Sequence, residues 1–332
     1  MKSILYKALP ILSLALITGC SITPTTQVSA FAASTQSVSE KVDEVLTAYN
    51  ETHIERQYVS IAQLYQGKYA PRLPVDDISE IAEPISPEAK KRLASYRANR
   101  ALGSYASALS ILSNAASQND IDSASASLYG SISGLNAQYK VINNSTDDLF
   151  SNEDMALFST LVSSIGYAIA SKKKNDAIKS IVIIADPKVA KICDVLIEEL
   201  KSAALYDGIY QSKKYIFDEY LEDYKTRAGD MANINNRKEL IIDLHAMYED
   251  LASTKLMIQQ TQAALSSVKN AHKVLADELT RDRFTSAALA KSIGHLVEVR
   301  NHYGDYESFL LTCKKRSKDD KGHLSCDDEI SP

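Results

Sequence analysis

The stretch that decides the fold is residues 240–279, LIIDLHAMYEDLASTKLMIQQTQAALSSVKNAHKVLADEL. Alternating steps of four and three residues run along it and reach twelve positions, nine of them apolar: Leu240, Leu244, Met247, Leu251, Thr254, Ile258, Thr261, Leu265, Val268, His272, Leu275 and Leu279. This period places the twelve side chains on one narrow stripe of an α-helix, as in a coiled coil. A helix of this length is ~60 Å long. The stretch therefore predicts a long helix packed along its stripe against other helices.

The composition favours helix in the rest of the chain as well. Among 332 residues there are 11 Gly, 8 Pro and no Trp, and Ala, Ser, Leu and Lys are abundant. These residues form helices more readily than strands. No stretch alternates convincingly between apolar and polar residues, and no repeat unit is visible. The predicted fold class is all-α, an elongated helical bundle with coiled-coil-like packing in its C-terminal half.

Proline and polar clusters mark the predicted ends of the other helices. Asp186-Pro187 is expected to stop one helix and to start the next, because proline has no amide hydrogen to donate. The polar cluster Gln118-Asn119-Asp120 is expected to break the helix that precedes it. The predicted helices are Val38 to Lys68, Asp76 to Ala82, Pro87 to Ser117, Ile121 to Asn143, one capped by Ser151 or Asn152, Pro187 to Asp230, and one from Asp282 or Thr285 to Leu311.

The first residues have the pattern of a secretory signal. Lys2 and Lys7 provide positive charge, and Ala8 to Ile17 is uncharged and mostly apolar. The apolar run is shorter than the ~20 residues that a membrane-spanning helix needs. An export signal that is removed is therefore the favoured interpretation.

The apolar run ends in Ile17-Thr18-Gly19-Cys20, which resembles the lipobox of bacterial lipoproteins. Ile17 stands where that family most often has Leu. The resemblance implies cleavage before Cys20, lipid on the Cys20 sulfur and anchoring in a bacterial membrane. By analogy with enterobacterial lipoproteins, Ser21 implies the outer membrane, with the protein facing the periplasm or the cell surface. The alternative is an ordinary signal peptide followed by a chance cysteine.

The predicted organisation has four parts. Residues 1–19 are the signal peptide and residues 20–36 a lipidated tether. The tether has no charge and is rich in Ser, Thr and Ala, so it should be a flexible coil with a reach of ~22 Å. Residues 37–313 form the helical bundle, and residues 314–332 form a charged, mobile C-terminal tail. The bundle loosely resembles uncharacterised helical lipoproteins in the texture of its Ala/Ser-rich segment Ser86 to Asn143, and this likeness implies no function.

Three cysteines remain beyond Cys20. Cys313 and Cys326 are close in sequence, and a disulfide between them would stabilise an exported chain by ~3 kcal/mol. Cys193 lies in an apolar helical pattern and is expected to be a buried thiol. Pairings through Cys193 remain open.

Charge and motifs narrow the function classes. The chain carries 37 Lys and Arg against 42 Asp and Glu, a net charge of −5. A mildly acidic protein has no overall field that favours nucleic acid. The sequence contains no nucleotide-binding glycine motif, serine-hydrolase elbow, HExxH or CxxC motif. We therefore assign no catalytic, cofactor-binding or metal-binding residue.

Two weak groups of histidine and carboxylate remain. His295, Glu298 and His302 share one helical face and could bind Zn²⁺, but a solvated polar face is the favoured interpretation. His245 and Glu249 form a weaker pair. His272 falls on the heptad stripe and is expected to be a packed core histidine.

Two further patterns concern packing. An aromatic stripe is interpreted mainly as core, with a half-exposed binding groove as the alternative: Tyr206, Tyr210, Phe217, Tyr220 and Tyr224. The carboxylates beside it are interpreted as a solvated acidic face: Asp218, Glu219, Glu222 and Asp223. The small residues of Gly130-Ser-Ile-Ser-Gly134 are expected to let neighbouring helices approach closely.

Three function classes fit these features. The first is a non-enzymatic scaffold or adaptor that is lipid-anchored in the cell envelope and contacts an envelope protein or a second copy. The second is a periplasmic module that binds a ligand or glycan. The third, a membrane-active helical protein, would need a longer apolar hairpin than Ile178 to Ala185 provides. We favour the scaffold.

Overall fold

The computed structural model describes residues 25–65, 72–79, 81, 87–164, 171–227, 233–281, 287–312, 316–318 and 324–326. The predicted all-α bundle is confirmed. The helices are α1 Thr25–Leu64, α2 Val75–Ser79, α3 Pro87–Asn114, α4 Gln118–Asn143, α5 Asn152–Ser164, α6 Ser171–Leu200, α7 Ala203–Arg227, α8 Ile234–Thr280 and α9 Ala287–Thr312. None of the helices within these ranges is both long and apolar enough to cross a bilayer.

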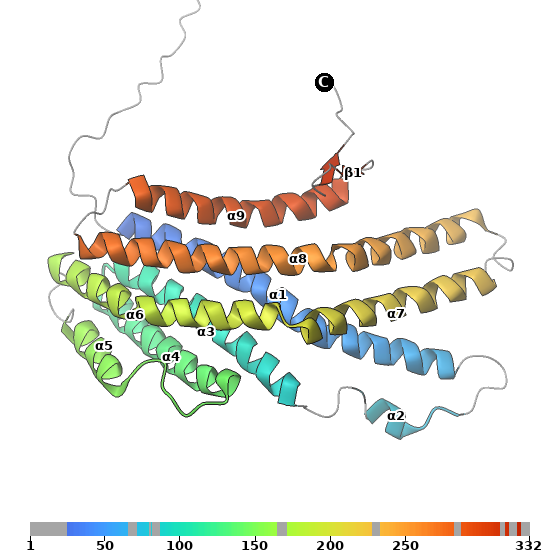
Figure 1. Ribbon diagram of the computed structural model, residues 1–332, viewed down its shortest axis with the longest axis horizontal. Coiled ribbons are helices and arrows are strands. Elements are labelled where there is room, and N and C mark those ends of the chain that lie inside the picture. The colour runs from blue at the N-terminus through green and yellow to red at the C-terminus, as the bar shows by residue number, and fades with distance from the viewer. Residues whose placement is uncertain are drawn as a thin grey trace, which may run out of the picture.

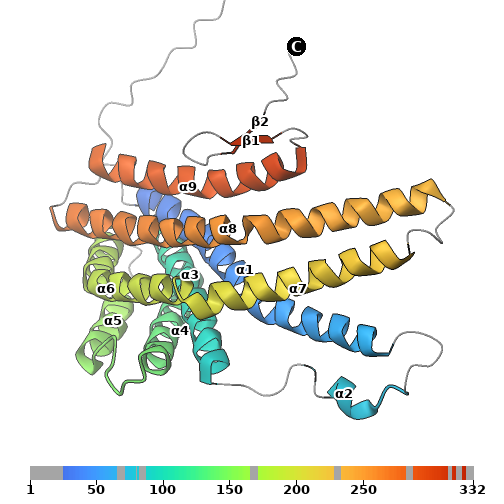
Figure 2. The same ribbon diagram turned by 45° about the vertical axis from the view of Figure 1, so that its right-hand side comes forward.

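The molecule has a thick body and a thin arm. The body holds α3, α4, α5, α6 and α9 together with the first half of α1 and the second half of α8 (Figure 1). The remaining halves of α1 and α8 project from the body side by side with α7, as both views show (Figure 2). We call residues 50–64, 213–227 and 234–250 the arm.

The heptad stripe of α8 is the main seam of the body. Every stripe position from Leu251 to Leu279 is buried, and His272 is completely inaccessible. Three earlier positions, Leu240, Leu244 and Met247, are only half-buried because they lie in the arm. The predicted helix is confirmed along its whole length, and its packing is tight only where the body surrounds it.

The prediction of a flexible tether over residues 20–36 is wrong from residue 25 onward. Helix α1 begins at Thr25, and Val28, Phe31 and Ala32 are buried in the core. Apolar side chains at this spacing on a surface rich in small residues are enough to dock the segment, because burial of an aromatic ring outweighs the low helix propensity of Ser and Thr. Cys20 and the predicted signal peptide lie outside the described residues.

The helix boundary predicted at Asp186-Pro187 is wrong, because no helix ends there. Helix α6 runs from Ser171 through Pro187 to Leu200. A proline inside a helix costs ~3 kcal/mol, but Ala185 and Val189 on either side are completely buried, so packing of α6 holds the helix together.

The predicted helix from Pro187 to Asp230 divides at Ser202 instead. The amide of Ser202 donates to the Glu199 carbonyl at 3.1 Å, and the amide of Leu205 donates to the Ser202 carbonyl at 3.1 Å. The side-chain amide of Gln262 on α8 donates to the Leu200 carbonyl at 3.1 Å, so one of the last carbonyls of α6 has a hydrogen-bond partner.

The predicted break between two helices is present, but it lies at residues 115–117, and residues 118–120 form the first turn of α4. Ser117 caps α4, because the Asp120 amide donates to the Ser117 hydroxyl while the Asp120 carboxylate accepts from the Ser117 amide. Within α4, the expected close approach is confirmed at Gly134, where a Cβ would lie 3.4 Å from the Ala101 Cβ on α3. It is wrong for Gly130, where a Cβ would meet nothing within 4 Å.

A short hairpin interrupts the segment that we expected to be a mobile charged tail. Strands β1 Arg316–Lys318 and β2 Leu324–Cys326 pair in antiparallel fashion, with Arg316 opposite Cys326. Strands of three residues carry too little alternation to be recognised in a sequence.

Candidate functional site

The arm leaves the body at Tyr49 of α1. On one face of the Tyr49 ring, the guanidinium of Arg92 from α3 lies 3.6 Å from the ring centroid. Gly208 of α7 lies close to the same ring, and a Cβ added to it would overlap Cε2 of Tyr49. Cation–π attraction and the missing side chain therefore hold Tyr49 between two helices. At this point α1 exchanges α3 for α7 as its neighbour.

Beyond Tyr49 the three helices share very little core. Among the arm residues, all of which are described, only Val59 and Ile216 are buried. Contacts at the arm surface replace the missing core: Arg56 lies 5.0 Å from the Tyr215 ring centroid, and the Phe217 and Tyr248 rings lie 5.9 Å apart. The arm is consequently a thin layer of helices with open spaces between them.

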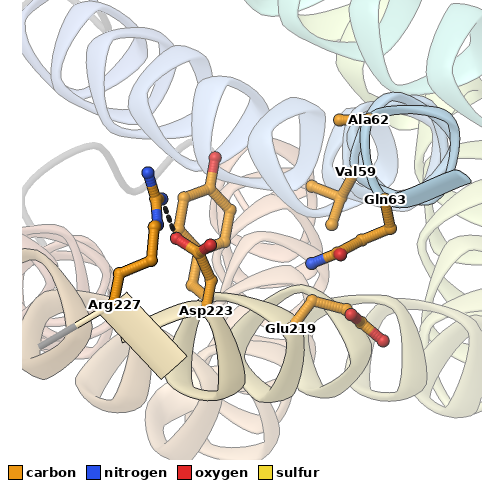
Figure 3. A pocket seen from close by; sticks show the side chains of 7 residues that line it. Val59, Ala62, Gln63, Glu219, Asp223 and Arg227 are labelled. Carbon is orange, nitrogen blue, oxygen red and sulfur yellow. Dashed lines mark hydrogen bonds and ion pairs between the residues drawn. The ribbon is translucent and has the colours of Figure 1, made fainter. Parts of the chain in front are cut away.

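The most distinct of these spaces lies between α1 and α7, and we call it the arm groove. It has a volume of about 310 Å³ and is lined by Val59, Ala62, Gln63, Glu219, Tyr220, Asp223 and Arg227. Figure 3 shows Gln63 on the α1 side and Glu219 on the α7 side, while Asp223 and Arg227 form an ion pair farther along α7. The groove thus combines an apolar strip with charged edges.

A second hollow, of about 360 Å³, lies where α1, α7 and α8 meet, and is lined by Glu51, Thr52, Glu55, Lys213, Ile216, Met247 and Asp250. The Lys213 ammonium donates to the Asp250 carboxylate at 2.7 Å. Only 10% of the Lys213 side chain is exposed, so this ion pair ties α7 to α8 at the base of the arm. We assign this hollow a structural role.

The acidic residues of α7 are largely paired along their own helix. Asp218 pairs with Lys214, Asp223 with Arg227, and Glu222 with Lys225 at 3.2 Å. Such surface pairs stabilise the helix by ~0.3–0.5 kcal/mol each. Glu219 and Asp223 both line the arm groove, where Asp223 pairs with Arg227.

The aromatic stripe of α7 is not the core face that we expected. The buried face consists of Leu205, Ile209, Ser212 and Ile216, and the stripe runs along the edge of that face. Tyr206 and Tyr210 stack with centroids 5.5 Å apart, and Tyr220 is 41% exposed. The stripe is therefore half-exposed: Tyr206 packs against the core, and Tyr220 is the member that lines the arm groove. That the stripe binds a partner stays a prediction.

His272 is confirmed as a packed core histidine, and it joins three helices. Its Nδ1 lies 3.0 Å from the Asp186 carboxylate of α6, and its Nε2 lies 3.0 Å from the Tyr105 hydroxyl of α3. Burial and the nearby Asp186 raise the pKa of Tyr105 well above its usual value, so the tyrosine stays protonated and donates to Nε2. Phe31 of α1 packs against the imidazole with ring centroids 5.4 Å apart. None of the described cavities reaches this triad, so we interpret it as structural.

The remaining predicted site residues stay dispersed. His295 Nδ1 and Glu298 lie 3.6 Å apart on the exposed face of α9, and the side chain of His302 lies outside the described residues. His245 Nδ1 and Glu249 are 4.0 Å apart on α8. The described part of the chain holds no group of three or more His, Cys, Asp or Glu side chains placed to bind a metal ion.

Cys193 is a buried thiol as expected. Burial raises its pKa to about 12, so it stays protonated and unreactive. Cys313 lies outside the described residues, and its disulfide with Cys326 therefore stays a prediction.

Sequence analysis missed the arm groove, and the apolar pattern of α1 gives no signal for it, because Ile54, Ile61 and Leu64 continue that pattern past Leu46. Only the burial changes: between Thr25 and Leu46 helix α1 buries seven apolar residues, whereas beyond Leu46 it buries only Val59.

No protein family model matches the chain, and neither the curated proteins nor the solved structures contain a match to it.

Proposed function

We propose that this protein is a non-enzymatic scaffold of the bacterial cell envelope, anchored by lipid on Cys20, that holds a helical segment of a partner protein in the arm groove. The observation that carries the proposal is the open space between α1 and α7, with its apolar strip and charged edges. Three helices without a common core are an incomplete bundle, and a fourth helix would supply the missing contacts.

The lining of the groove suits an amphipathic helix. Val59, Ala62 and Tyr220 offer an apolar strip for the apolar face of such a helix, and Glu219 offers a carboxylate for a Lys or Arg at its edge. Half-exposed tyrosines are frequent at interfaces because an apolar ring and a polar hydroxyl share one rigid side chain. A partner of this kind would bind mainly through Tyr220.

A glycan is the second candidate, because the exposed Tyr220 lies beside carboxylates in a groove of about 310 Å³. That volume is at the small end of the ~300–1,000 Å³ typical of ligand pockets. The groove is also open along its length, which suits a helix better than a small ring.

The test is crosslinking in cells with a photoreactive amino acid in place of Tyr220. We expect one discrete adduct with another protein. Tyr129 on α4 of the body, 56% exposed, is the matched control and should give none. Glu219→Lys should reduce the Tyr220 adduct at least fivefold. Equal adducts at both positions would contradict the proposal, and labelling of cell-wall material in place of protein would favour the glycan.

The anchor makes a separate prediction. Cys20→Ser should abolish incorporation of a labelled fatty acid and release the protein from the membrane fraction, because the proposed lipid attaches to that sulfur. Two or more acyl chains give stable anchoring at ~0.8 kcal/mol per buried CH₂. Label that persists in Cys20→Ser would rule out this attachment site. Cys193→Ser should leave labelling unchanged and is the control.

A further inference from the structure

Helix α8 carries a second apolar face in the arm, distinct from its heptad stripe. Ile234, Ile241 and Tyr248 are spaced seven residues apart, and at 100° per residue they lie within ~40° of one another around the helix. Ile242 lies beside them. We call these four residues the α8 strip, and their exposed fractions are 69%, 51%, 54% and 54% in the order Ile234, Ile241, Ile242, Tyr248.

The α8 strip is long enough for a second helix to pack on it. It extends over ~21 Å of helix, and residues repeated every seventh position are the pattern by which helices pair. The arm groove does not include it, because the groove is lined by α1 and α7 alone. The strip is therefore a surface separate from the proposed partner site.

The charges on the same face indicate what covers it. Lys238 lies on this face near the start of the strip, and Glu249, which is 4.0 Å from His245 Nδ1 on the same helix, lies near its end. If two α8 helices cross in antiparallel fashion about a point between residues 243 and 244, Lys238 of each copy meets Glu249 of the other. A parallel pair would instead place Lys238 against Lys238.

We propose that two copies of this chain associate through their arms, with the α8 strips packed in antiparallel fashion around a two-fold axis. A two-fold interface uses the same patch on both copies, so both strips are covered at once and both Lys238–Glu249 pairs form. The ends of the two arms then overlap, and the two bodies lie on opposite sides of the contact.

Thiol crosslinking of the full chain in cells tests the arrangement, with Cys313 and Cys326 replaced by serine and a short bismaleimide as the probe. Ile242→Cys lies near the two-fold axis and should give at least ten times more dimer than Val141→Cys, a control of similar exposure (52%) on α4. Ile234→Cys should not crosslink to itself, because its two copies would be ~28 Å apart along the helices. Ile234→Cys coexpressed with Ala252→Cys should crosslink.

A second measurement does not depend on new thiols. Ile241→Lys should convert the purified protein from a dimer to a monomer, so the particle mass measured by analytical ultracentrifugation should be halved. Its helical circular dichroism should be unchanged. Val141→Lys should change neither quantity. Dimer no greater than that of Val141→Cys, or a monomeric unaltered chain, would overturn the proposal. Self-crosslinking of Ile234→Cys would overturn the antiparallel arrangement, and an adduct of Ile242→Cys with a different protein would assign the strip to that protein. The crosslink at Tyr220 is read separately, so either proposal can fail alone.

Discussion

Replacing His272 with alanine should lower the free energy of unfolding by about 3–5 kcal/mol. The imidazole is completely buried, and it is the common partner of Tyr105 and Asp186. Its removal leaves a cavity against Phe31 and leaves the buried Tyr105 hydroxyl without an acceptor. An unsatisfied buried polar group alone costs ~1–3 kcal/mol. Urea unfolding followed by circular dichroism measures the change.

Lys273→Ala is the matched control, because Lys273 is the next residue of α8 and its side chain is 62% exposed. It should change stability by less than ~0.5 kcal/mol. Tyr105→Phe removes only the hydroxyl and should cost less than His272→Ala. In a double-mutant cycle the two changes should be non-additive, since they remove the same hydrogen bond. A cost below ~1 kcal/mol for His272→Ala would show that the triad does not tie α3, α6 and α8 together.

Gly208→Ala should destabilise the protein, although alanine usually stabilises a helix. Replacing glycine with alanine in a helix gains ~1 kcal/mol from propensity alone. Here the added methyl would overlap Cε2 of Tyr49, and the Arg92 guanidinium, 3.6 Å from the centroid of the same ring, limits how the ring can move. Overpacking of this kind costs ~1–3 kcal/mol, so we expect a net loss of up to about 2 kcal/mol.

Gly130→Ala should change the free energy of unfolding in the opposite direction and stabilise the chain. Gly130 is in the interior of α4, and an added Cβ meets nothing within 4 Å, so the propensity gain of up to ~1 kcal/mol should appear in full. In the Tyr49→Ala background, Gly208→Ala should instead stabilise the chain relative to Tyr49→Ala alone, because the methyl then has space. Thermal unfolding of the four chains decides between these effects. Equal stabilisation by Gly208→Ala and Gly130→Ala would mean that Tyr49 does not fill the space beside α7.

The sequence predicts where the helices lie better than it predicts which residues of other helices they pack against. The α8 stripe is visible because its period is local, and even His272 could be assigned to the core from its place on that stripe. Its bonding partners could not be found, since Tyr105 and Asp186 are far away in the chain and neither has a distinctive local pattern. The core aromatic Phe31 was hidden for a related reason, because the Ser/Thr/Ala residues around it resemble a linker until α3 and α8 surround them.

The candidate site could not be predicted for the same reason, because it depends on how helices that are distant in the sequence pack together. The sequence places Tyr220 in an aromatic stripe with four other residues, but it does not show that Tyr220 is the one that lines the groove. That depends on where α1 runs, which a helix wheel cannot supply.

Pro187 shows that local cost is a poor guide in a buried helix. The ~3 kcal/mol penalty of an internal proline is smaller than the stabilisation from burying residues such as Ile181, Val182 and Ile192 along α6.

The early start of α1 also sets the distance between the proposed lipid anchor and the arm groove. If lipid holds Cys20, only five residues separate the membrane surface from a rigid helix of 40 residues, and a stretch of five can extend at most ~17 Å. The helix itself is ~60 Å long, and it begins in the body and ends at the far end of the arm. The arm groove would therefore lie at a set distance from the lipid on Cys20, and this distance is determined by the length of a helix and not by a flexible coil.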